Sequence, residues 1–248
     1  MKADLLSNKS VKQIEIVKIN GNSSFPFTDD ISIEEPLEIR VSYLVADQKE
    51  SKNISVTMRT PGNDAELAAG FLFTEGIISS WNQIKNIHYP ELQCSRNSDN
   101  VVIVELIDNF APELKKTDRN FYTTSSCGVC GKGSIESIRT VSPFLHHKKE
   151  NTVVSLEMIY QLSEKLRSFQ NNFSVTGGIH ASGIFDLEGS LLALREDVGR
   201  HNALDKLIGY ALSAEMLPLA DKILVLSGRA SLNLFRKRQW QESLLLQQ

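Results

Sequence analysis

Cysteine is scarce in this sequence, with three residues in a chain of 248. So few cysteines in a chain of this length do not make a disulfide framework, and a reducing cytoplasm is the natural compartment for such a protein. They also fall short of the four ligands that a structural zinc ion requires. The scarcity therefore argues against a disulfide-rich secreted scaffold and against a zinc site built from cysteine alone.

Long apolar runs and an excess of basic charge are missing as well. No stretch approaches the roughly 20 apolar residues of a membrane helix, and residues 1–9 contain no apolar core of a secretory signal. The net charge of −3 argues against general nucleic-acid binding, although a local basic groove could coexist with it. We expect a cytoplasmic protein that binds neither a membrane nor nucleic acid.

What is present is the composition of a soluble globular protein that can bury a sizeable core. The chain is 41% hydrophobic and 23% charged, and its length allows one large domain or two small ones. Residues 1–115 are expected to form a strand-rich domain, because 14–19 and 37–43 show the period-two alternation of half-buried strands. Further strands are predicted over 54–58 and 101–107.

One helix is expected to interrupt these strands. The turn at residues 61–64 offers a helix N-cap, and residues 65–74 are rich in helix formers. The small residues Ala68, Ala69 and Gly70 would let another element approach this helix closely. Residues 109–126 then carry few apolar side chains, which indicates a boundary and a long exposed loop leading to Cys127.

Residues 116–231 are expected to form an α/β domain, in which helix and strand alternate. Ser155 could cap a helix whose apolar face is made by Ile159, Leu162, Leu166 and Phe169. Strands are predicted over 182–186, 191–194 and 223–226. Asn202 could cap a second helix with apolar residues at positions 204, 207, 208, 211 and 212. The fold class is therefore α+β or α/β.

Two of the three cysteines, Cys127 and Cys130, lie in Thr-Thr-Ser-Ser-Cys-Gly-Val-Cys-Gly at residues 123–131. A thiol is nucleophilic only as the thiolate, which needs exposure and a positive or hydrogen-bonding neighbourhood. Gly amides, Ser and Thr hydroxyls and Lys132 offer that neighbourhood. A structural cysteine in a tight turn is the competing interpretation, because a Cys-x-x-Cys pair alone is shared by zinc sites, thioredoxins and sulfur carriers.

Zinc chemistry fits this spacing poorly. Zinc needs four ligands, and the remaining cysteine, Cys94, lies in a strand-rich region where we interpret it as incidental. In zinc deaminases a Glu follows the ligand His by two residues, ahead of the cysteines. Here His180 is followed by Ala181 and Ser182 and comes after the cysteines. We expect no metal site.

A polar ligand site is predicted from two later segments. Gly177 and Gly178 before His180 would allow close backbone approach to a phosphate or pterin, although a glycine turn at a strand start explains them equally well. Asp197, with Glu196 beside it, and Arg200 and His201 crowd the start of a predicted helix, where amide groups and Arg200 could hold an anion. Capping charges at a helix start are the competing explanation.

Together these segments resemble the formate dehydrogenase accessory sulfurtransferase family, the FdhD/NarQ-like sulfur carriers. The matching stretches cover most of residues 35–231. They are Glu35-Pro-Leu-Glu-Ile-Arg-Val, Met58-Arg-Thr-Pro-Gly-Asn-Asp-Ala-Glu-Leu-Ala-Ala-Gly-Phe-Leu, Ser126-Cys-Gly-Val-Cys-Gly-Lys, Thr176-Gly-Gly-Ile-His, Arg195-Glu-Asp-Val-Gly-Arg-His-Asn-Ala-Leu-Asp-Lys and Leu226-Ser-Gly-Arg-Ala-Ser. The stretch from Arg195 is too long to match by chance.

The resemblance implies a cytoplasmic sulfur carrier that takes persulfide sulfur from a cysteine desulfurase. It passes the sulfur to the molybdenum cofactor before that cofactor enters formate dehydrogenase. The resemblance also implies a homodimer, a second domain like cytidine deaminase without its zinc, and binding of bis-molybdopterin guanine dinucleotide as substrate. Carried over to this chain, the persulfide cysteine is Cys127 and the second loop cysteine is Cys130. A non-catalytic chaperone that only holds the cofactor for formate dehydrogenase, and a thiol redox protein, remain the alternatives, so enzymatic activity as a sulfurtransferase stays open.

The resemblance stops after Ser231. Residues 232–248 can be written in codons that, preceded by one T, read Phe-Glu-Leu-Val-Gln-Lys-Ala-Ala-Met-Ala-Gly-Ile-Pro-Ile-Val-Ala-Ala, a helix, a stop and a buried strand. We expect that loss of one base near codon 231 put this tail out of frame and truncated the second domain. The tail could form a short amphipathic helix but not replace a buried strand, so weak or no activity is expected.

Overall fold

A computed structural model of the chain describes residues 10–90, 98–114, 121–122, 154–229 and 244–247. The described part is a mixed α+β fold, which confirms the expected fold class. Its strands are β1 (Val11–Asn20), β2 (Ser23–Ser32), β3 (Glu35–Val45), β4 (Gln48–Arg59), β5 (Ile84–His88), β6 (Val101–Leu106), β7 (Phe121–Tyr122), β8 (His180–Phe185), β9 (Leu191–Asp197), β10 (Ile223–Leu226) and β11 (Leu244–Gln247). Its helices are α1 (Asp64–Thr74), α2 (Leu156–Phe169), α3 (Asn171–Thr176) and α4 (Arg200–Ser213), with short 3-10 turns at Trp81–Gln83 and Ser98–Asn100.

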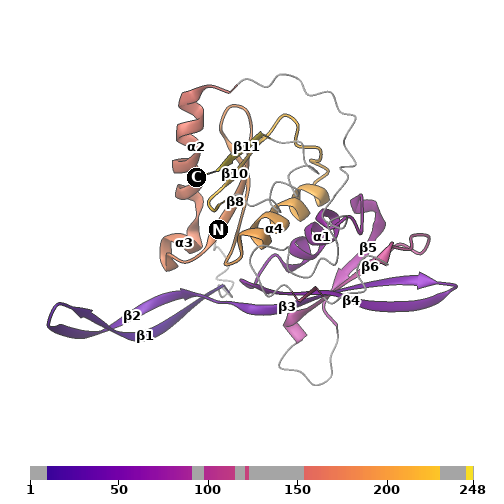
Figure 1. Cartoon of the computed structure of the whole chain (residues 1–248), viewed down its shortest axis with the longest axis horizontal. Helices are drawn as coiled ribbons and strands as arrows, with labels where there is room; N and C mark the ends of the chain where they lie inside the picture. The colour runs from indigo at the N-terminus through magenta and orange to yellow at the C-terminus, as the bar shows by residue number, and fades with distance from the viewer. Residues whose placement is uncertain (1–9, 91–97, 115–120, 123–153, 230–243, 248) are drawn as a thin grey trace, which may run out of the picture.

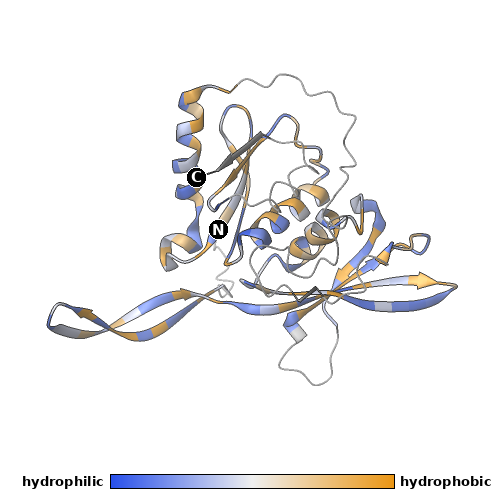
Figure 2. Cartoon of the chain, in the orientation of Figure 1, coloured by the Kyte–Doolittle hydropathy of each residue, from blue (hydrophilic) through white to orange (hydrophobic). Residues whose placement is uncertain are grey.

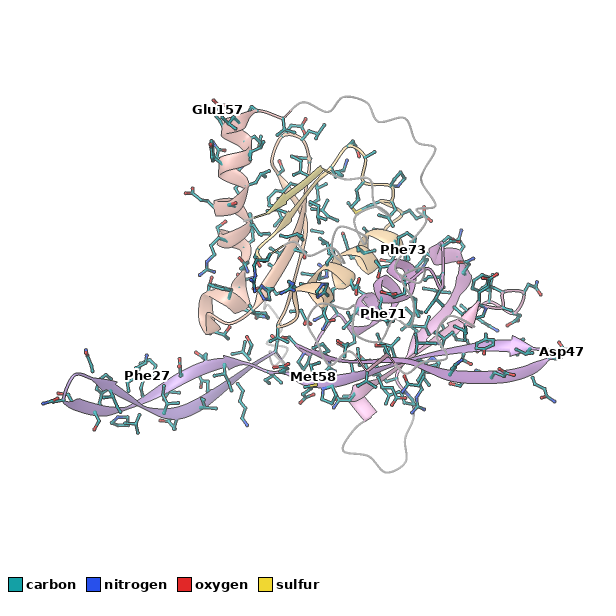
Figure 3. The ribbon with its side chains drawn as sticks, viewed as in Figure 1. Phe27, Asp47, Met58, Phe71, Phe73 and Glu157 are labelled. Carbon is teal, nitrogen blue, oxygen red and sulfur yellow. The ribbon has the colours of Figure 1, made fainter. Side chains whose placement is uncertain are left out.

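The first large sheet has the strand order β5-β6-β3-β4-β7. Strand β3 lies in its centre and alternates fully buried Leu37, Ile39 and Val41 with more exposed residues. It continues into antiparallel β4 through Ala46 and Asp47, which both have positive φ, as a two-residue hairpin loop requires. Figure 3 labels Asp47 at one end of the long axis of the molecule.

The second sheet has the order β11-β10-β8-β9. Strand β8 runs antiparallel to both β9 and β10. The start of β8 and the ends of β9 and β10 therefore meet at one edge of the sheet. Helix α2 covers one face, where Leu166 packs so close to β8 that a Cβ on Gly183 would lie 2.7 Å from its Cδ1. Helices α4 and α1 lie on the other face (Figure 1).

Helix α2 begins as the sequence predicts, because the Ser155 hydroxyl accepts a hydrogen bond from the Met158 amide at 3.2 Å. Leu162 and Leu166 are fully buried. Phe169, which was expected on the same face, is 50% exposed, because it is the last residue of the helix. The expected apolar face is thus correct in its centre and wrong at its end.

The two halves of the chain share one hydrophobic core. Helix α1 from the first half and helix α4 from the second cross between the two sheets and pack into the same cluster as Ile39 and Val104 of the first sheet and Ile184 of the second. A Cβ on Gly70 would lie 1.8 Å from the Asp205 carbonyl oxygen, and a Cβ on Gly209 would lie 1.9 Å from that of Glu66. The expected close approach at Gly70 is therefore confirmed, with α4 as the neighbour.

Strands β1 and β2 form a separate two-stranded ribbon that projects from the body (Figure 1). The sequence predicted β1 but missed β2, which contains Pro26, Asp29 and Asp30. Several apolar side chains of the ribbon are exposed, up to 77% for Ile19 of β1. Hydrophobic and hydrophilic stretches alternate along the ribbon out to its end (Figure 2). At its base, the Ser32 and Thr176 hydroxyls lie 2.9 Å apart and join β2 to α3.

The C-terminal residues differ from the prediction. Leu244–Gln247 form strand β11, which pairs in parallel with β10 in the register Ile223 to Leu244. The expectation of a short amphipathic helix is wrong for these four residues, which form a strand at the edge of the sheet. The edge of β10 offers unpaired backbone groups, and an extended apolar run can satisfy them. Residues 230–243 lie outside the described residues.

The glycine crossing predicts a sharp loss of stability when either glycine gains a side chain. In Gly209→Ala the new methyl would meet backbone rather than a flexible side chain, so we expect a loss of about 1–3 kcal/mol in the free energy of unfolding. Urea denaturation measures it. Gly178→Ala is the matched control, because its Cβ would meet its nearest atom at 3.9 Å. Equal midpoints for both variants would contradict the close crossing.

Candidate functional site

The predicted ligand residues converge on one edge of the second sheet, where β8 begins and β9 and β10 end. His180 is the first residue of β8 and the cross-strand partner of Asp197, the last residue of β9. Arg200 begins α4, with only Val198 and Gly199 between it and the end of β9. This edge therefore gathers His180, Asp197 and Arg200 from three elements.

Gly228 completes this cluster and was not assigned a role from the sequence. A Cβ at Gly228 would lie 3.0 Å from His180 Nδ1 and 3.6 Å from Arg200 Cβ. The missing side chain leaves room for both neighbours. A glycine two positions after the buried strand 223–226 is the signal that could have found it, because such a position allows close approach at a strand end.

The environment of His180 favours its neutral form. Burial lowers the pKa of His180 from its ordinary value, and the positive charge of Arg200 lowers it further, while Asp197 acts in the opposite direction. The imidazole is therefore uncharged at neutral pH and can both donate and accept a hydrogen bond. Arg200 supplies the positive charge of the cluster.

Asp197 lies behind this cluster and is fully buried. Its Oδ1 accepts hydrogen bonds from the Gly199 amide at 2.8 Å and from Asn202 Nδ2 at 3.2 Å. Its Oδ2 lies 2.8 Å from Lys206 Nζ and accepts from the Thr60 amide at 3.1 Å. Burial raises the pKa of the Asp197 carboxyl, and Lys206 opposes that shift. Both carboxylate oxygens already bond to protein groups. Asp197 therefore holds neighbouring residues in place rather than facing a ligand.

Lys206 is the counter-ion of Asp197 and is also buried. Besides the carboxylate it donates to the Thr60 carbonyl at 2.8 Å and to the Glu196 carbonyl at 3.4 Å. A buried ammonium that meets three acceptors is fully satisfied, which is the condition under which a buried charge is tolerated. Sequence reasoning missed both Lys206 and Thr60, although both lie inside the stretches that carry the family resemblance.

Asn202 was expected to cap α4, and this expectation is wrong. The helix begins earlier, with Gly199 as its N-cap, and Asn202 lies inside the first turn. Its amide nitrogen donates to the Met58 carbonyl at 2.7 Å, and its oxygen accepts from the Thr57 hydroxyl at 3.2 Å. Asn202 therefore ties α4 to the end of β4 instead of closing a helix end.

The charged residues just before Asp197 also have structural partners. The Glu196 carboxylate accepts hydrogen bonds from the Asn172 and Phe173 amides, each at 3.0 Å, and so anchors the start of α3. Arg195 forms a bidentate ion pair with Glu66 of α1, in which a terminal guanidinium nitrogen lies 2.7 Å from Glu66 Oε1 and Nε donates to Oε2. The competing explanation of structural charges thus holds for Glu196, and the stretch from Arg195 binds the two halves together.

A second buried ion pair fixes the turn into α1. Arg59 donates two hydrogen bonds to the Asp64 carboxylate, each at 3.0 Å, and Tyr89 donates a third at 3.1 Å. Burial, followed by the charge of Asp64, raises the pKa of Tyr89 to about 12. Asn63 occupies the N-cap position of α1, but its side chain makes no capping hydrogen bond. The predicted turn is there, with φ of 108° at Gly62 and 56° at Asn63.

Gly177, Gly178 and His201 lie on the segments that adjoin the cluster. Gly177 ends α3 with a φ of 67°, a conformation that favours glycine, and a Cβ there would meet no atom within 4 Å. Gly178 follows, two residues before His180. His201 is the second residue of α4 and is half-buried. Open space around the glycines suits the close approach of a ligand.

Cys127 and Cys130 lie outside the described residues, so their role and their distance from the cluster stay predictions. Among the described residues, no group of three or more His, Cys, Asp and Glu side chains could hold a metal ion. None of the described helices is long and apolar enough to cross a membrane.

Comparison with known proteins gives a consistent set of similarities. The sequence profile of the FdhD/NarQ family matches residues 33–240. A relative named sulfur carrier protein FdhD from Mycolicibacterium paratuberculosis is 47% identical over 226 residues, which cover 90% of this chain and 79% of the relative. A protein of the same name from Sulfolobus acidocaldarius is 38% identical over 227 residues, 92% of this chain and 79% of the relative.

One solved structure shares the fold. The crystal structure of a candidate formate dehydrogenase accessory protein from Desulfotalea psychrophila superposes with a TM-score of 0.68 and covers 96% of this chain and 84% of its own. At 20% sequence identity this likeness supports the fold alone. Its coverage includes both halves of the chain.

The buried ion pair predicts an asymmetric response to mutation. Asp197→Ala leaves Lys206 buried without a counter-ion and should lower the free energy of unfolding by about 3–5 kcal/mol. The double variant Asp197→Ala with Lys206→Met removes both charges and should recover much of that loss. Asp221→Ala, in an exposed pair with Lys222, is the control and should change little. Urea denaturation measures the free energy of unfolding of these three variants. A double variant no more stable than Asp197→Ala would contradict the pairing.

Proposed function

Because this chain belongs to the FdhD/NarQ family, we propose that it is a sulfur carrier that supports formate dehydrogenase. The observation that carries the proposal is the identity of up to 47%, over nine-tenths of the chain, with proteins named sulfur carrier protein FdhD. The finer steps below rest on the cysteine motif and on the cluster around His180.

The sulfur is carried as a persulfide on Cys127. The Cys127 thiolate attacks the outer sulfur of a persulfide on a cysteine desulfurase, and the desulfurase cysteine leaves as a thiolate. One sulfur–sulfur bond forms and one breaks, so no external oxidant or reductant is needed for loading. The neighbours of Cys127 in the sequence at 123–131 are small or carry hydroxyl groups, as suits a thiol that two large partners must reach in turn.

The receiving substrate is bis-molybdopterin guanine dinucleotide, bound at the edge of the second sheet. Arg200 and the N-terminal end of α4 attract the phosphate groups of the dinucleotide, because amide groups and the helix dipole favour anions there. Neutral His180 offers a donor and an acceptor to the pterin or guanine, and His201 adds a second imidazole beside Arg200. Gly177, Gly178 and Gly228 let the substrate approach the backbone.

The carrier works between two partners in the cytoplasm, a cysteine desulfurase that supplies sulfur and a formate dehydrogenase that receives the sulfurated cofactor. It acts as a homodimer. A chaperone that only holds the cofactor would need the His180 cluster but not a reactive cysteine. A thiol redox protein would need Cys127 and Cys130 to cycle through a stable disulfide. The cysteine chemistry therefore separates the three functions.

The carrier role predicts that Cys127 alone gains sulfur. Incubation of the protein with a cysteine desulfurase and cysteine should add the mass of sulfur to the wild type, and Cys127→Ala should lose this adduct because no acceptor thiolate remains. Intact-mass spectrometry measures it. Cys94→Ala is the matched control and should still be loaded. Formate dehydrogenase activity that persists with Cys127→Ala would favour the chaperone.

The substrate site predicts that nucleotide binding depends on Arg200. GDP serves as the probe, as a fragment of the dinucleotide, and isothermal titration calorimetry measures its Kd. Arg200→Met should weaken binding about tenfold or more, because a charge-assisted contact to phosphate is lost. Arg40→Met, which removes an arginine from a surface pair with Glu38, should leave the Kd unchanged. Equal effects of both substitutions would contradict the site.

A further inference from the structure

We propose that Thr60 is a positioning residue of the substrate site. It holds the turn between β9 and α4 from the first half of the chain, and thereby fixes Arg200 and His201 relative to His180. The inference rests on the proposed function in one respect, namely that the cluster around His180 binds the substrate. The first half of the chain contributes none of the predicted ligand contacts. Through Thr60 it nevertheless takes a direct part in shaping the site.

The amide, the hydroxyl and the carbonyl of Thr60 all form hydrogen bonds with residues 197–206. Its amide donates to Asp197 Oδ2 at 3.1 Å, its hydroxyl accepts from the Val198 amide at 3.1 Å, and its carbonyl accepts from Lys206 Nζ at 2.8 Å. Thr60 is 1% exposed, so these bonds are shielded from water. The amide and carbonyl contacts would be available to any residue at this position, but the contact to Val198, 138 positions away, needs the threonine hydroxyl.

The turn that Thr60 holds has few other anchors. It consists of Val198 and Gly199, whose amides are taken by the Thr60 hydroxyl and by Asp197 Oδ1 respectively. The helix that follows begins at Arg200 without a side-chain cap. The partly buried Val198 amide would lose its acceptor if the hydroxyl were removed, and an amide shielded from water without a partner is costly. The turn would then shift toward an alternative partner and move Arg200 with it.

The rest of α4 is held independently, so the effect should stay local. Further along the helix, Gly209 lies in backbone contact with Glu66, and Leu204 and Leu207 are buried in the core. Loss of the Thr60 hydroxyl therefore loosens the first turn of α4 without releasing the helix. This separation lets positioning be tested apart from folding.

The test compares Thr60→Val, which removes the hydroxyl at nearly constant shape, with Thr60→Ser, which keeps it. Thr74→Val is the matched control, because the buried Thr74 hydroxyl also contacts α4, donating to Asp205 Oδ1 at 3.0 Å, but lies away from the turn. The first readout is the titration of His180 by NMR. Its signal is assigned among the five histidines with His180→Gln. The second readout is the Kd for GDP.

In Thr60→Val the pKa of His180 should rise toward its ordinary value of 6.5, because Arg200 lowers it in the wild type and would move away. Asp197, the other charged group acting on His180, would reinforce the rise as Arg200 withdraws. GDP binding should weaken roughly tenfold. Thr60→Ser and Thr74→Val should resemble the wild type in both readouts. If Thr60→Val does not fold, Thr60→Ala carries the same test.

An unchanged His180 titration in Thr60→Val, or the same change in Thr60→Ser or Thr74→Val, would overturn the proposal. The two hypotheses can fail separately. If the wild type does not bind GDP, the substrate assignment fails, whereas the His180 titration still decides whether Thr60 positions Arg200.

Discussion

The buried ion pair between Asp197 and Lys206 constrains much of this structure. Neither side chain reaches water, so each requires the other, and their remaining bonding capacity must be met by neighbours held in fixed places. Thr60 from the first half meets that demand together with Asn202 and the turn at Gly199. The ends of β4 and β9 and the start of α4 are thereby brought to one point. A charge pair that the core can tolerate only in one arrangement specifies how the halves fit together.

The same arrangement explains why charged residues of two distant stretches are buried or paired. The stretch from Met58 and the stretch from Arg195 contact each other directly, and Figure 3 labels Met58 near the junction of the ribbon with the body. Residues inside these stretches divide into two groups. Asp197, Asn202 and Lys206 point into the interface between the halves, whereas Arg200 and His201 stand at its rim. Buried residues with structural partners and half-buried residues proposed to face the substrate thus alternate within one motif.

The sequence predicted the regular elements where the hydrophobic period was clean. Strand β3, with its alternating Leu37, Ile39 and Val41, and helix α2 with its Ser155 cap are examples. Strand β2 was missed because Pro26, Asp29 and Asp30 are unfavourable in strands, although Phe25 and Phe27 alternate and Gly21-Asn22 between β1 and β2 is a hairpin signal. The register of pairing, which places His180 beside Asp197, could not be predicted, since it depends on contacts between distant strands.

The polar site was predicted in outline and misread in detail for the same reason. A carboxylate, an arginine and a histidine within five residues indicate a ligand site, but the sequence does not tell which of them faces inward. Asp197 is satisfied by Thr60, a partner 137 residues away that carries no periodic or charged signal. Glu196 likewise finds two amides of α3. Such long-range pairing decides the role of each charge, and only the fold reveals it.

The crossing of α1 and α4 at Gly70 and Gly209 has a consequence for how this protein can vary over evolution. Because backbone meets backbone there, the distance between α1 and α4 is set by main-chain atoms and not by the volume of any side chain. Substitutions elsewhere in the core can change its packing without changing that distance. Relatives could therefore diverge widely in their cores and still present the rim of the site in the same place.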